Sequence, residues 1–370
     1  MKRIALAALA TATALTLTAC GTAPQSTVEE LLPLPSISTD NGLVIDGEEI
    51  ADAELYAAAR EHSVSLASGM SYEAEQLTVE RFTQETGIEV EFTRMPSNKL
   101  LERVLSEAGA GRLSVDVIRT TDMKAATTLA DNDVLVAYTT PNQEQLNADG
   151  VVFDEGKFVS SFYSLYSFAF NNRVLTGDQV PANWEDLLDE SLRERIGLVQ
   201  VGAGSYNLAL MDFLIRTFGE DYLAQMGELS PRVYDSASVQ IEALTRGEIA
   251  VATLGLNNGV ALARSGAPVT MVLPAAGASG AYTPLGLTTR GQDNPAAQVF
   301  MNWQMSKSGQ RFAAAQGFVP SRSDLGELAS NGYVLPGPDD PTFQVFTPED
   351  QAARQKDVVA VWKDAFNYNS

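Results

Sequence analysis

Four short segments of the chain carry small or hydroxyl residues just before a predicted helix. They are Ser68-Gly69-Met70-Ser71, Thr120-Thr121-Asp122, Gly202-Ala203-Gly204-Ser205-Tyr206 and Gly255-Leu256-Asn257-Asn258. The first backbone N–H groups of a helix have no partner inside the helix and lie at the positive end of its dipole, so they attract anions and carboxylates. These turns therefore predict a pocket for a small anionic ligand.

Each turn also has a simpler interpretation, because serine, threonine, aspartate and asparagine are the preferred N-cap residues of helices. A cap explains any single turn equally well, whereas four such turns at one edge of a fold favour a pocket. Tyr206 and Tyr282 are candidates for aromatic walls, although Tyr206 also fits the core face of its helix. The predicted ligand-binding residues are Ser68, Gly69, Ser71, Thr121, Asp122, Gly204, Ser205, Tyr206, Asn257, Asn258 and Tyr282.

Strand-like and helix-like segments alternate around these turns. Residues 64–67 form a short apolar run, residues 72–86 have helical composition and end before Gly87, and residues 88–92 alternate with period two. A second series of this kind begins at the aromatic run 162–170. A β-α-β-α-β rhythm predicts a mainly parallel sheet with helices on both faces, so the two series predict a two-lobed α/β fold.

The only cysteine, Cys20, follows a signal-like N-terminus. Met1-Lys2-Arg3 is basic, residues 4–17 are almost all apolar or threonine, and Leu17-Thr18-Ala19-Cys20-Gly21 resembles the lipobox of bacterial lipoproteins. We therefore expect an exported protein that is cleaved before Cys20, acylated there and held at the outer face of a membrane. The alternative is a plain signal peptide with an unrelated cysteine.

The predicted organisation follows from these segments. Residues 22–41 are rich in threonine, serine and proline and predict a flexible tether, and residues 48–60 predict a short lead-in helix. The expected parts are a lipoprotein signal peptide (1–20), a tether with the lead-in helix (21–62), the first part of lobe 1 (63–165), lobe 2 (166–282), and a return segment of lobe 1 with the C-terminal helices (283–370).

Composition and motifs exclude several function classes. The net charge of −22 argues against nucleic acid as a partner, because phosphate contacts need lysine and arginine. The lone histidine, His62, lies outside every candidate turn, and the chain has neither a Gly-x-Ser-x-Gly elbow nor a complete phosphate loop. We therefore expect no catalytic residues, no cofactor and no metal site, and hence not an enzyme.

Long stretches of the chain resemble extracellular solute-binding proteins of ABC importers, in the two-lobed type II periplasmic-binding class. The resemblance spans nearly all of residues 63–322, and within the class it is greatest to the branch with iron(III)-, thiamine-, phosphonate- and polyamine-binding members. The matching stretches are FTQETGIEVEF (82–92), LLERVLSEAGAGRLSVDVI (100–118), FAFNNRVLTGDQVPANWEDLLDESLRERIGL (168–198), IEALTRGEIAVATLG (241–255) and NPAAQVFMNWQMSKSGQRFAAAQGFVPSR (294–322).

This resemblance implies two hinge crossovers, a ligand between the lobes, and a monomer whose closed form docks on a membrane permease. It also implies that Trp184 belongs to the core, whereas Tyr163, Tyr166 and Phe168, near the expected hinge, belong either to the pocket or to the core. A liganded protein that signals to a membrane kinase is an alternative to transport, because both roles use the same closure.

The residues also narrow the class of ligand. Where the iron(III) branch usually has a tyrosine pair, this chain has Gly255-Leu256-Asn257-Asn258-Gly259, which argues against direct capture of iron but leaves an iron complex possible. Asp122 is the only acid in the four turns, so a polyamine fits poorly. A phosphonate, a phosphate ester or a carboxylate fits better, with Arg119 and Arg173 as candidate counter-charges.

Overall fold

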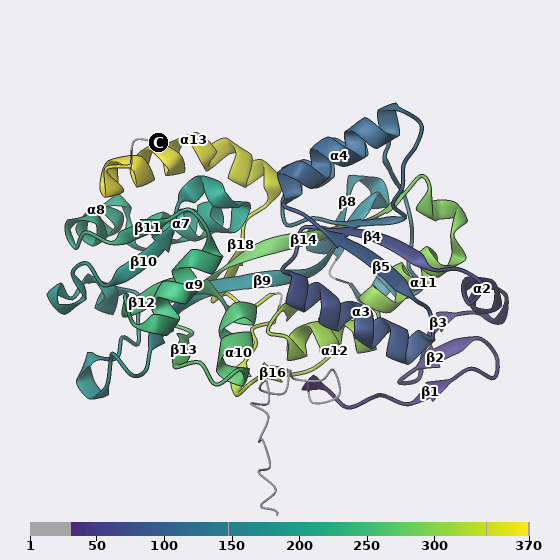
Figure 1. Cartoon of the computed structure of the whole chain (residues 1–370), viewed down its shortest axis with the longest axis horizontal. Helices are drawn as coiled ribbons and strands as arrows, with labels where there is room; N and C mark the ends of the chain where they lie inside the picture. The colour runs from purple at the N-terminus through teal and green to yellow at the C-terminus, as the bar shows by residue number, and fades with distance from the viewer. Residues whose placement is uncertain (1–30, 147, 338, 369–370) are drawn as a thin grey trace, which may run out of the picture.

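The computed structural model describes residues 31–146, 148–337 and 339–368. The predicted signal peptide, Cys20 and residues 21–30 of the predicted tether lie outside these residues. Two halves flank a pair of long strands, as Figure 1 shows. We call the half built on β4, β5 and β6 the first lobe and the half built on β10, β11, β12 and β13 the second lobe.

One sheet runs through both lobes in the order β11-β10-β12-β9-β14-β6-β4-β5. In the first lobe β4 (Val64–Ser68) pairs in parallel with β5 (Val90–Arg94) and β6 (Val117–Arg119). In the second lobe β10 (Ile196–Val199) pairs in parallel with β11 (Arg232–Tyr234) and β12 (Val251–Gly255). The predicted parallel pairing is therefore present within each lobe.

Two long antiparallel strands join the lobes. β9 (Phe158–Asn171) pairs with β14 (Ala278–Thr288), with β12, and with β13 (Val269–Val272). β14 also pairs with β6 of the first lobe. The lobe boundaries expected at residues 165/166 and 282/283 thus fall inside β9 and β14 and not in linkers. Short strands complete the edges: β7 (Leu135–Val136), β8 (Val152–Phe153), β15 (Val319–Pro320) and the separate pair β16 (Ala329–Ser330) and β17 (Tyr333–Val334).

The helices of the first lobe begin and end where local signals predict. In α3 (Tyr72–Thr86) the Ser71 side chain caps the first turn, and Gly87 ends the helix in the left-handed conformation, with φ of 71°. Proline suits the first turn of α11, where Asn294 is the cap. The helices of this lobe are α3, α4 (Ser97–Gly109), α5 (Met123–Asp131), α6 (Ala148–Val151), α11 (Pro295–Met305) and α12 (Lys307–Ala315).

The helices of the second lobe are α7 (Ser205–Phe218), α8 (Glu220–Glu228), α9 (Ala237–Arg246) and α10 (Leu256–Arg264). Of these, α7 and α8 pack on a separate aromatic core, whereas α9 and α10 contribute to the larger core that also includes the first lobe. Trp184 is fully buried in the aromatic core, and its indole N–H donates to the Gly277 carbonyl at 2.9 Å, so the predicted core role of this tryptophan is confirmed.

The segment expected to be a tether is partly folded. A three-stranded antiparallel sheet, β1 (Ile37–Ser38), β2 (Leu43–Ile45) and β3 (Glu48–Ala51), precedes α2 (Ala53–Ala59), so the lead-in helix is shorter than expected. Leu43, Ile45 and Ile50 are fully buried in the first-lobe core. Within the predicted tether (22–41) the described part includes the short strand β1, whereas β3 occupies the start of the predicted helix (48–60), where burial of Ile50 favours pairing with β2.

The guanidinium of Arg81 fixes the chain just before this small sheet. This buried side chain on α3 donates to the carbonyls of Leu32 and Pro33 at 2.6 and 2.7 Å, and it also pairs with Glu85. The described chain therefore starts on the first lobe.

The C-terminal helix corrects a second expectation. Residues 283–370 were expected to belong to lobe 1, but α13 (Pro348–Phe366) follows β18 (Phe343–Val345) and packs on α7 and α8 of the second lobe. Figure 1 shows this helix lying across the top of that lobe. Trp362 is buried in the second-lobe core, and Arg354 on α13 donates to Asp212 on α7 at 2.6 Å. Amphipathic periodicity alone does not say which lobe such a helix covers.

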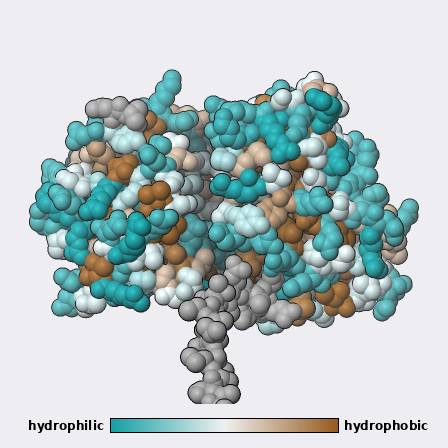
Figure 2. Space-filling view, viewed as in Figure 1, coloured by the Kyte–Doolittle hydropathy of each residue, from teal (hydrophilic) through white to brown (hydrophobic). Residues whose placement is uncertain are grey.

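The face of the molecule in Figure 2 is mostly hydrophilic, with a notch between the two lobes at the top of the view. No helix among the described residues combines the length and the apolar character needed to cross a bilayer.

The contact between α13 and α7 gives a stability prediction. Asp212 is buried and accepts hydrogen bonds from Arg216 and Arg354, whereas Asp350 in the same network is only partly buried. Asp212→Asn should lower the free energy of unfolding by about 2 kcal/mol, because it leaves two arginines without their shared buried partner. Asp350→Asn should cost less than about 1 kcal/mol. Guanidinium unfolding followed by tryptophan fluorescence measures both, and equal losses would contradict this ranking.

Candidate functional site

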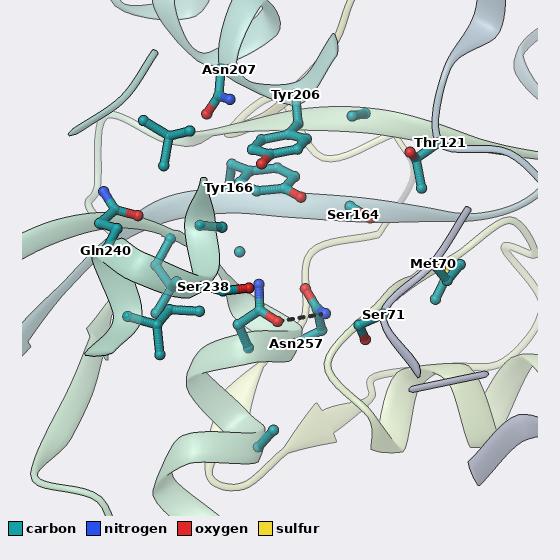
Figure 3. Close-up of a pocket in the computed structure, with 18 of the residues that line it drawn as sticks. Met70, Ser71, Thr121, Ser164, Tyr166, Tyr206, Asn207, Ser238, Gln240 and Asn257 are labelled. Atoms are coloured by element: carbon teal, nitrogen blue, oxygen red, sulfur yellow. Dashed lines mark hydrogen bonds between the residues drawn. The ribbon is translucent and has the colours of Figure 1, made fainter. Parts of the chain in front are cut away.

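A cavity of about 530 Å³ lies between the lobes and is lined from three directions. The joining strands contribute Ser164 and Tyr166 from β9 and Ala281 and Tyr282 from β14. Figure 3 shows Tyr166 and Tyr206 on one side of the cavity, with Asn257 and Ser71 on the opposite side. Residues from both lobes and from the strands that join them therefore line the site.

Two tyrosines form a stacked aromatic wall. The rings of Tyr166 and Tyr206 are 4.5 Å apart and inclined by only 8°. A Cβ atom at Gly255 would lie 3.2 Å from the Tyr166 ring, so glycine there makes room for it. Burial raises the pKa of Tyr166 well above its usual range, with a further contribution from Tyr206, and burial also raises the pKa of Tyr206. Both phenols are therefore neutral at physiological pH and offer O–H donors and a flat apolar face.

The first lobe contributes the loops after β4 and β6. Gly69, Met70, Ser71 and Thr121 line the cavity from this side. The Thr121 N–H donates to the hydroxyl of Ser97 at 3.2 Å, and the two hydroxyls lie 3.1 Å apart. A Cβ at Gly69 would lie 2.6 Å from that Ser97 oxygen, so glycine allows the two loops to approach closely.

The second lobe contributes amide and hydroxyl side chains from α7, α9, α10 and β12. Gly204 is the N-cap residue of α7 and Gly255 that of α10, so neither helix has a side-chain cap. In contrast, Ser71 caps α3 and Ser236 caps α9. The side chains that line this wall include Asn207, Ser238, Gln240, Thr253, Asn257 and Asn258.

Formal charge is nearly absent from the cavity. Among the described lining residues only Glu73 and Arg94 are charged, and both are exposed on the first lobe. In the part of the chain that the structure describes, no three histidine, cysteine, aspartate or glutamate side chains gather in a way that could hold a metal ion. Recognition here rests on dipoles, hydroxyls, amides and aromatic faces.

Most of the predicted ligand-binding residues reach the cavity. The ones that line it are Gly69, Ser71, Thr121, Tyr206, Asn257, Asn258 and Tyr282. Tyr282 is largely buried and its ring also packs against Phe153 and Tyr163, so it contributes to the core as well. Ser71 combines both interpretations, since it lines the cavity and its hydroxyl accepts from the Ala74 N–H at 3.4 Å.

Ser68, Asp122, Gly204 and Ser205 do not line the cavity. The hydroxyl of Ser68 is fully buried, where it donates to Glu75 and accepts from the Met70 N–H. Asp122 is an ordinary cap, because its carboxylate accepts from the Lys124 N–H at 2.9 Å. Gly204 lies behind the Tyr206 ring, since a Cβ there would be 2.6 Å from it.

Ser205 instead joins the two lobes. Its hydroxyl donates to the carbonyl of Thr121 at 2.7 Å. A second bond of this kind runs from the guanidinium of Arg264 on α10 to the carbonyl of Ala315 on α12, at 3.0 Å. Both donors belong to the second lobe and both carbonyls to the first, so these bonds hold the lobes together beside the cavity.

The two arginines considered as counter-charges do not line the cavity either. Arg119 is fully buried, where it pairs with Glu75 at 3.0 Å and lies over the Phe162 ring. Arg173 is exposed elsewhere. The cation that does line the cavity among the described residues is Arg94, which follows the strand predicted at residues 88–92.

The sequence left several lining residues unidentified. Strand alternation in β9 turns Ser164 and Tyr166 to the cavity and Tyr163 to the core, and the sequence contains this period-two signal. Phe168 shares the face of Tyr166 but does not line the cavity, because it lies in the second-lobe core. Ser238 and Gln240 lie after Ser236, a turn that was not among the four considered. Tyr166, which the resemblance assigns to either the pocket or the core, lines the cavity. The missed lining residues that carry a side-chain polar group or a large side chain include Met70, Glu73, Arg94, Ser164, Asn207, Ser238, Gln240, Thr253 and Phe318.

Solved structures share this fold at low sequence identity. Iron-bound HitA from Pseudomonas aeruginosa is 18% identical with a TM-score of 0.63, over 82% of this chain and 99% of that one. AfuA from Actinobacillus pleuropneumoniae, with fructose-6-phosphate bound, is 16% identical with a TM-score of 0.62, over 83% and 99%. A substrate-binding protein of an ABC transporter from Agrobacterium tumefaciens is 14% identical with a TM-score of 0.68, over 84% and 97%. The predicted two-lobed fold of type II periplasmic binding proteins is thereby confirmed.

Sequence comparison identifies the family. An uncharacterized protein from Haemophilus influenzae is 27% identical over 172 residues, which are 44% of this chain, and this chain spans about half (49%) of that relative's length. The family of bacterial extracellular solute-binding proteins matches residues 78–334, which is more than half of the chain. These residues include both joining strands and most of the cavity, and the protein therefore belongs to the family of bacterial extracellular solute-binding proteins.

Proposed function

We propose that the protein captures a small anion, a phosphonate, phosphate ester or carboxylate, between its lobes and delivers it to the membrane permease of an ABC importer. The observation that carries this proposal is the pair of helices, α7 and α10, that begin at the cavity without side-chain caps. The first N–H groups of α10 have no partner among the described residues, whereas in α7 the Asn207 N–H already donates to the Gly204 carbonyl at 3.1 Å, so α10 offers an anion more free donors than α7 does. The fructose-6-phosphate complex of AfuA is a precedent for an anionic solute in this fold.

The charges around the cavity favour an anion over the two alternatives. A polyamine needs carboxylates, and Glu73, an exposed residue, is the single carboxylate among the described lining residues. Direct capture of iron(III) needs several hard anionic donors that converge on the ion, and no such group of histidine, cysteine, aspartate and glutamate side chains gathers among the described residues. Arg94 lies at the exposed rim and adds attraction for an anion.

We further propose that the solute favours the closed arrangement of the lobes by contacting both of them. The Ser205–Thr121 and Arg264–Ala315 bonds are contacts that an opened cleft would lose. A solute shifts such an equilibrium only by its differential affinity for the closed state. The closed molecule is then the form that the permease recognises, in a role of binding and not of catalysis. Docking on a membrane kinase would instead indicate sensing.

A solute panel tests the charge of the ligand. Phosphate esters, phosphonates and carboxylates should raise the melting temperature of the purified protein, since a solute at 100 times its Kd adds about 2.7 kcal/mol. Iron(III) without a chelator, thiamine and polyamines should leave it unchanged, and iron(III) citrate is compared with citrate alone because citrate is itself a carboxylate. Differential scanning fluorimetry is the measurement. A shift with polyamines or iron alone would contradict anion capture without affecting membership of the family.

A charge placed at the start of α10 tests the position of the anion. Asn258→Asp should weaken binding of the anion found in the panel at least tenfold, because a carboxylate about 5 Å away repels it by roughly 3 kcal/mol at an effective dielectric constant of about 20. Asn98→Asp makes the same change in the exposed first turn of α4 and should leave the affinity within twofold. Isothermal titration calorimetry compares them. Tighter binding to Asn258→Asp would indicate a cationic solute.

The last part of the proposal is a lipid anchor at Cys20 on an exported monomer. The support is the sequence around Cys20, which resembles a lipobox. Cys20→Ser should move the protein from the membrane fraction to the soluble fraction or the medium, because no acyl chain can then be attached. Fractionation with immunoblotting measures this, with mass spectrometry of the unsubstituted protein to identify the acyl group. Equal membrane retention of both proteins would contradict anchoring at Cys20.

A further inference from the structure

Gln240 on α9 carries an acceptor without a partner at the wall of the cavity. The side chain is fully buried, and its amide N–H₂ donates to the Gly197 carbonyl at 2.8 Å and to the Thr253 hydroxyl oxygen at 3.4 Å. These two acceptors fix which end of the amide carries nitrogen. The other end, Oε1, has no hydrogen-bond partner among the described residues. Figure 3 shows this oxygen on the side turned toward the cavity.

A buried acceptor without a partner is costly, so its place beside a cavity points to a group that enters the cavity. Gln316 in the first lobe carries a similar acceptor and can be compared with Gln240. Its Oε1 is also buried and unpartnered, but this side chain does not line the cavity. Gln240 alone of these two glutamines is placed to meet a bound solute.

The neighbours of Gln240 decide which donor fits. The Thr253 oxygen already accepts from Gln240, so its O–H remains free to donate. The Asn207 amide nitrogen donates to the Gln200 carbonyl at 3.3 Å, which leaves its carbonyl oxygen as another neutral acceptor at the cavity. No carboxylate belongs to the second-lobe part of the described lining. Neutral acceptors beside hydroxyls match a hydroxyl group, whereas an ammonium group needs a carboxylate.

We propose that Gln240 Oε1 is a specificity-determining acceptor for a hydroxyl group of the solute, so that the protein selects hydroxylated anions. This inference rests on the proposed capture of an anion and extends it. The anionic group lies at the uncapped starts of α7 and α10, and the hydroxylated part lies against Gln240, Thr253 and Asn207. The stacked rings of Tyr166 and Tyr206 give the carbon skeleton a flat apolar surface.

A matched pair of probes tests the inference on the full chain. Glycerol 3-phosphate and propyl phosphate share the anionic group and the three-carbon skeleton and differ in two hydroxyls. Glycerol 3-phosphate should bind the unsubstituted protein at least tenfold more tightly by isothermal titration calorimetry. Gln240→Met, which keeps the length of the side chain, should reduce this preference to less than twofold. Gln316→Met is the matched control and should keep the full preference.

Each outcome of the probe comparison either supports or overturns the role of Gln240. Equal affinities of the two probes for the unsubstituted protein would overturn the inference and leave anion capture standing. Failure of both probes to bind would overturn the inference for phosphate esters, and the solute panel would then decide separately whether anion capture stands. A tenfold preference that persists in Gln240→Met, or one that is lost in Gln316→Met, would also overturn the role of Gln240. The comparison on the unsubstituted protein stands even if Gln240→Met does not fold.

Discussion

The antiparallel pairing of β9 with β14 is the interaction on which the rest of the structure depends. Both strands are long and mostly buried, and they carry the sheet of one lobe into the sheet of the other. Their register places Ser164 opposite Ala281 and Tyr166 opposite Ser279. Side chains alternate between the faces of a strand, so a slip of one residue would turn Tyr166 away from the cavity and into the core. The pairing therefore sets both the architecture and the floor of the site.

Local signals predicted much of the fold. The cap at Ser71, the left-handed Gly87 and the proline that begins α11 each act within one turn of chain, and the helices appear where these residues require them. Contacts between segments that lie far apart in the sequence were harder to predict. The small residues of Ala278-Ser279-Gly280-Ala281 have little strand propensity, and they form a strand because β9 and β18 pair with them. The placement of α13 depends on Asp212, far away in sequence.

The candidate site, too, could be predicted only as far as local signals determine it. Turns before helices identified the approximate place of the cavity, because strand ends and helix starts gather at one edge of an α/β sheet. The role of each side chain within a turn depends on its partners, which the sequence does not show. Ser68 faces a buried carboxylate, Asp122 caps its own helix, and Ser205 reaches across to the other lobe. Gln240 was missed because a glutamine within a helix usually faces solvent, whereas here two acceptors on the sheet hold it inside.

The two ends of the described chain lie on different lobes. Arg81 clamps the carbonyls of Leu32 and Pro33 to the first lobe, while α13 ends on the second. A molecule immobilised by its N-terminal side would hold the first lobe still and leave the second free to swing. Fluorophores attached at the two ends would report that swing as a change in resonance energy transfer. The topology thus lends itself to an optical biosensor that needs no label inside the cavity.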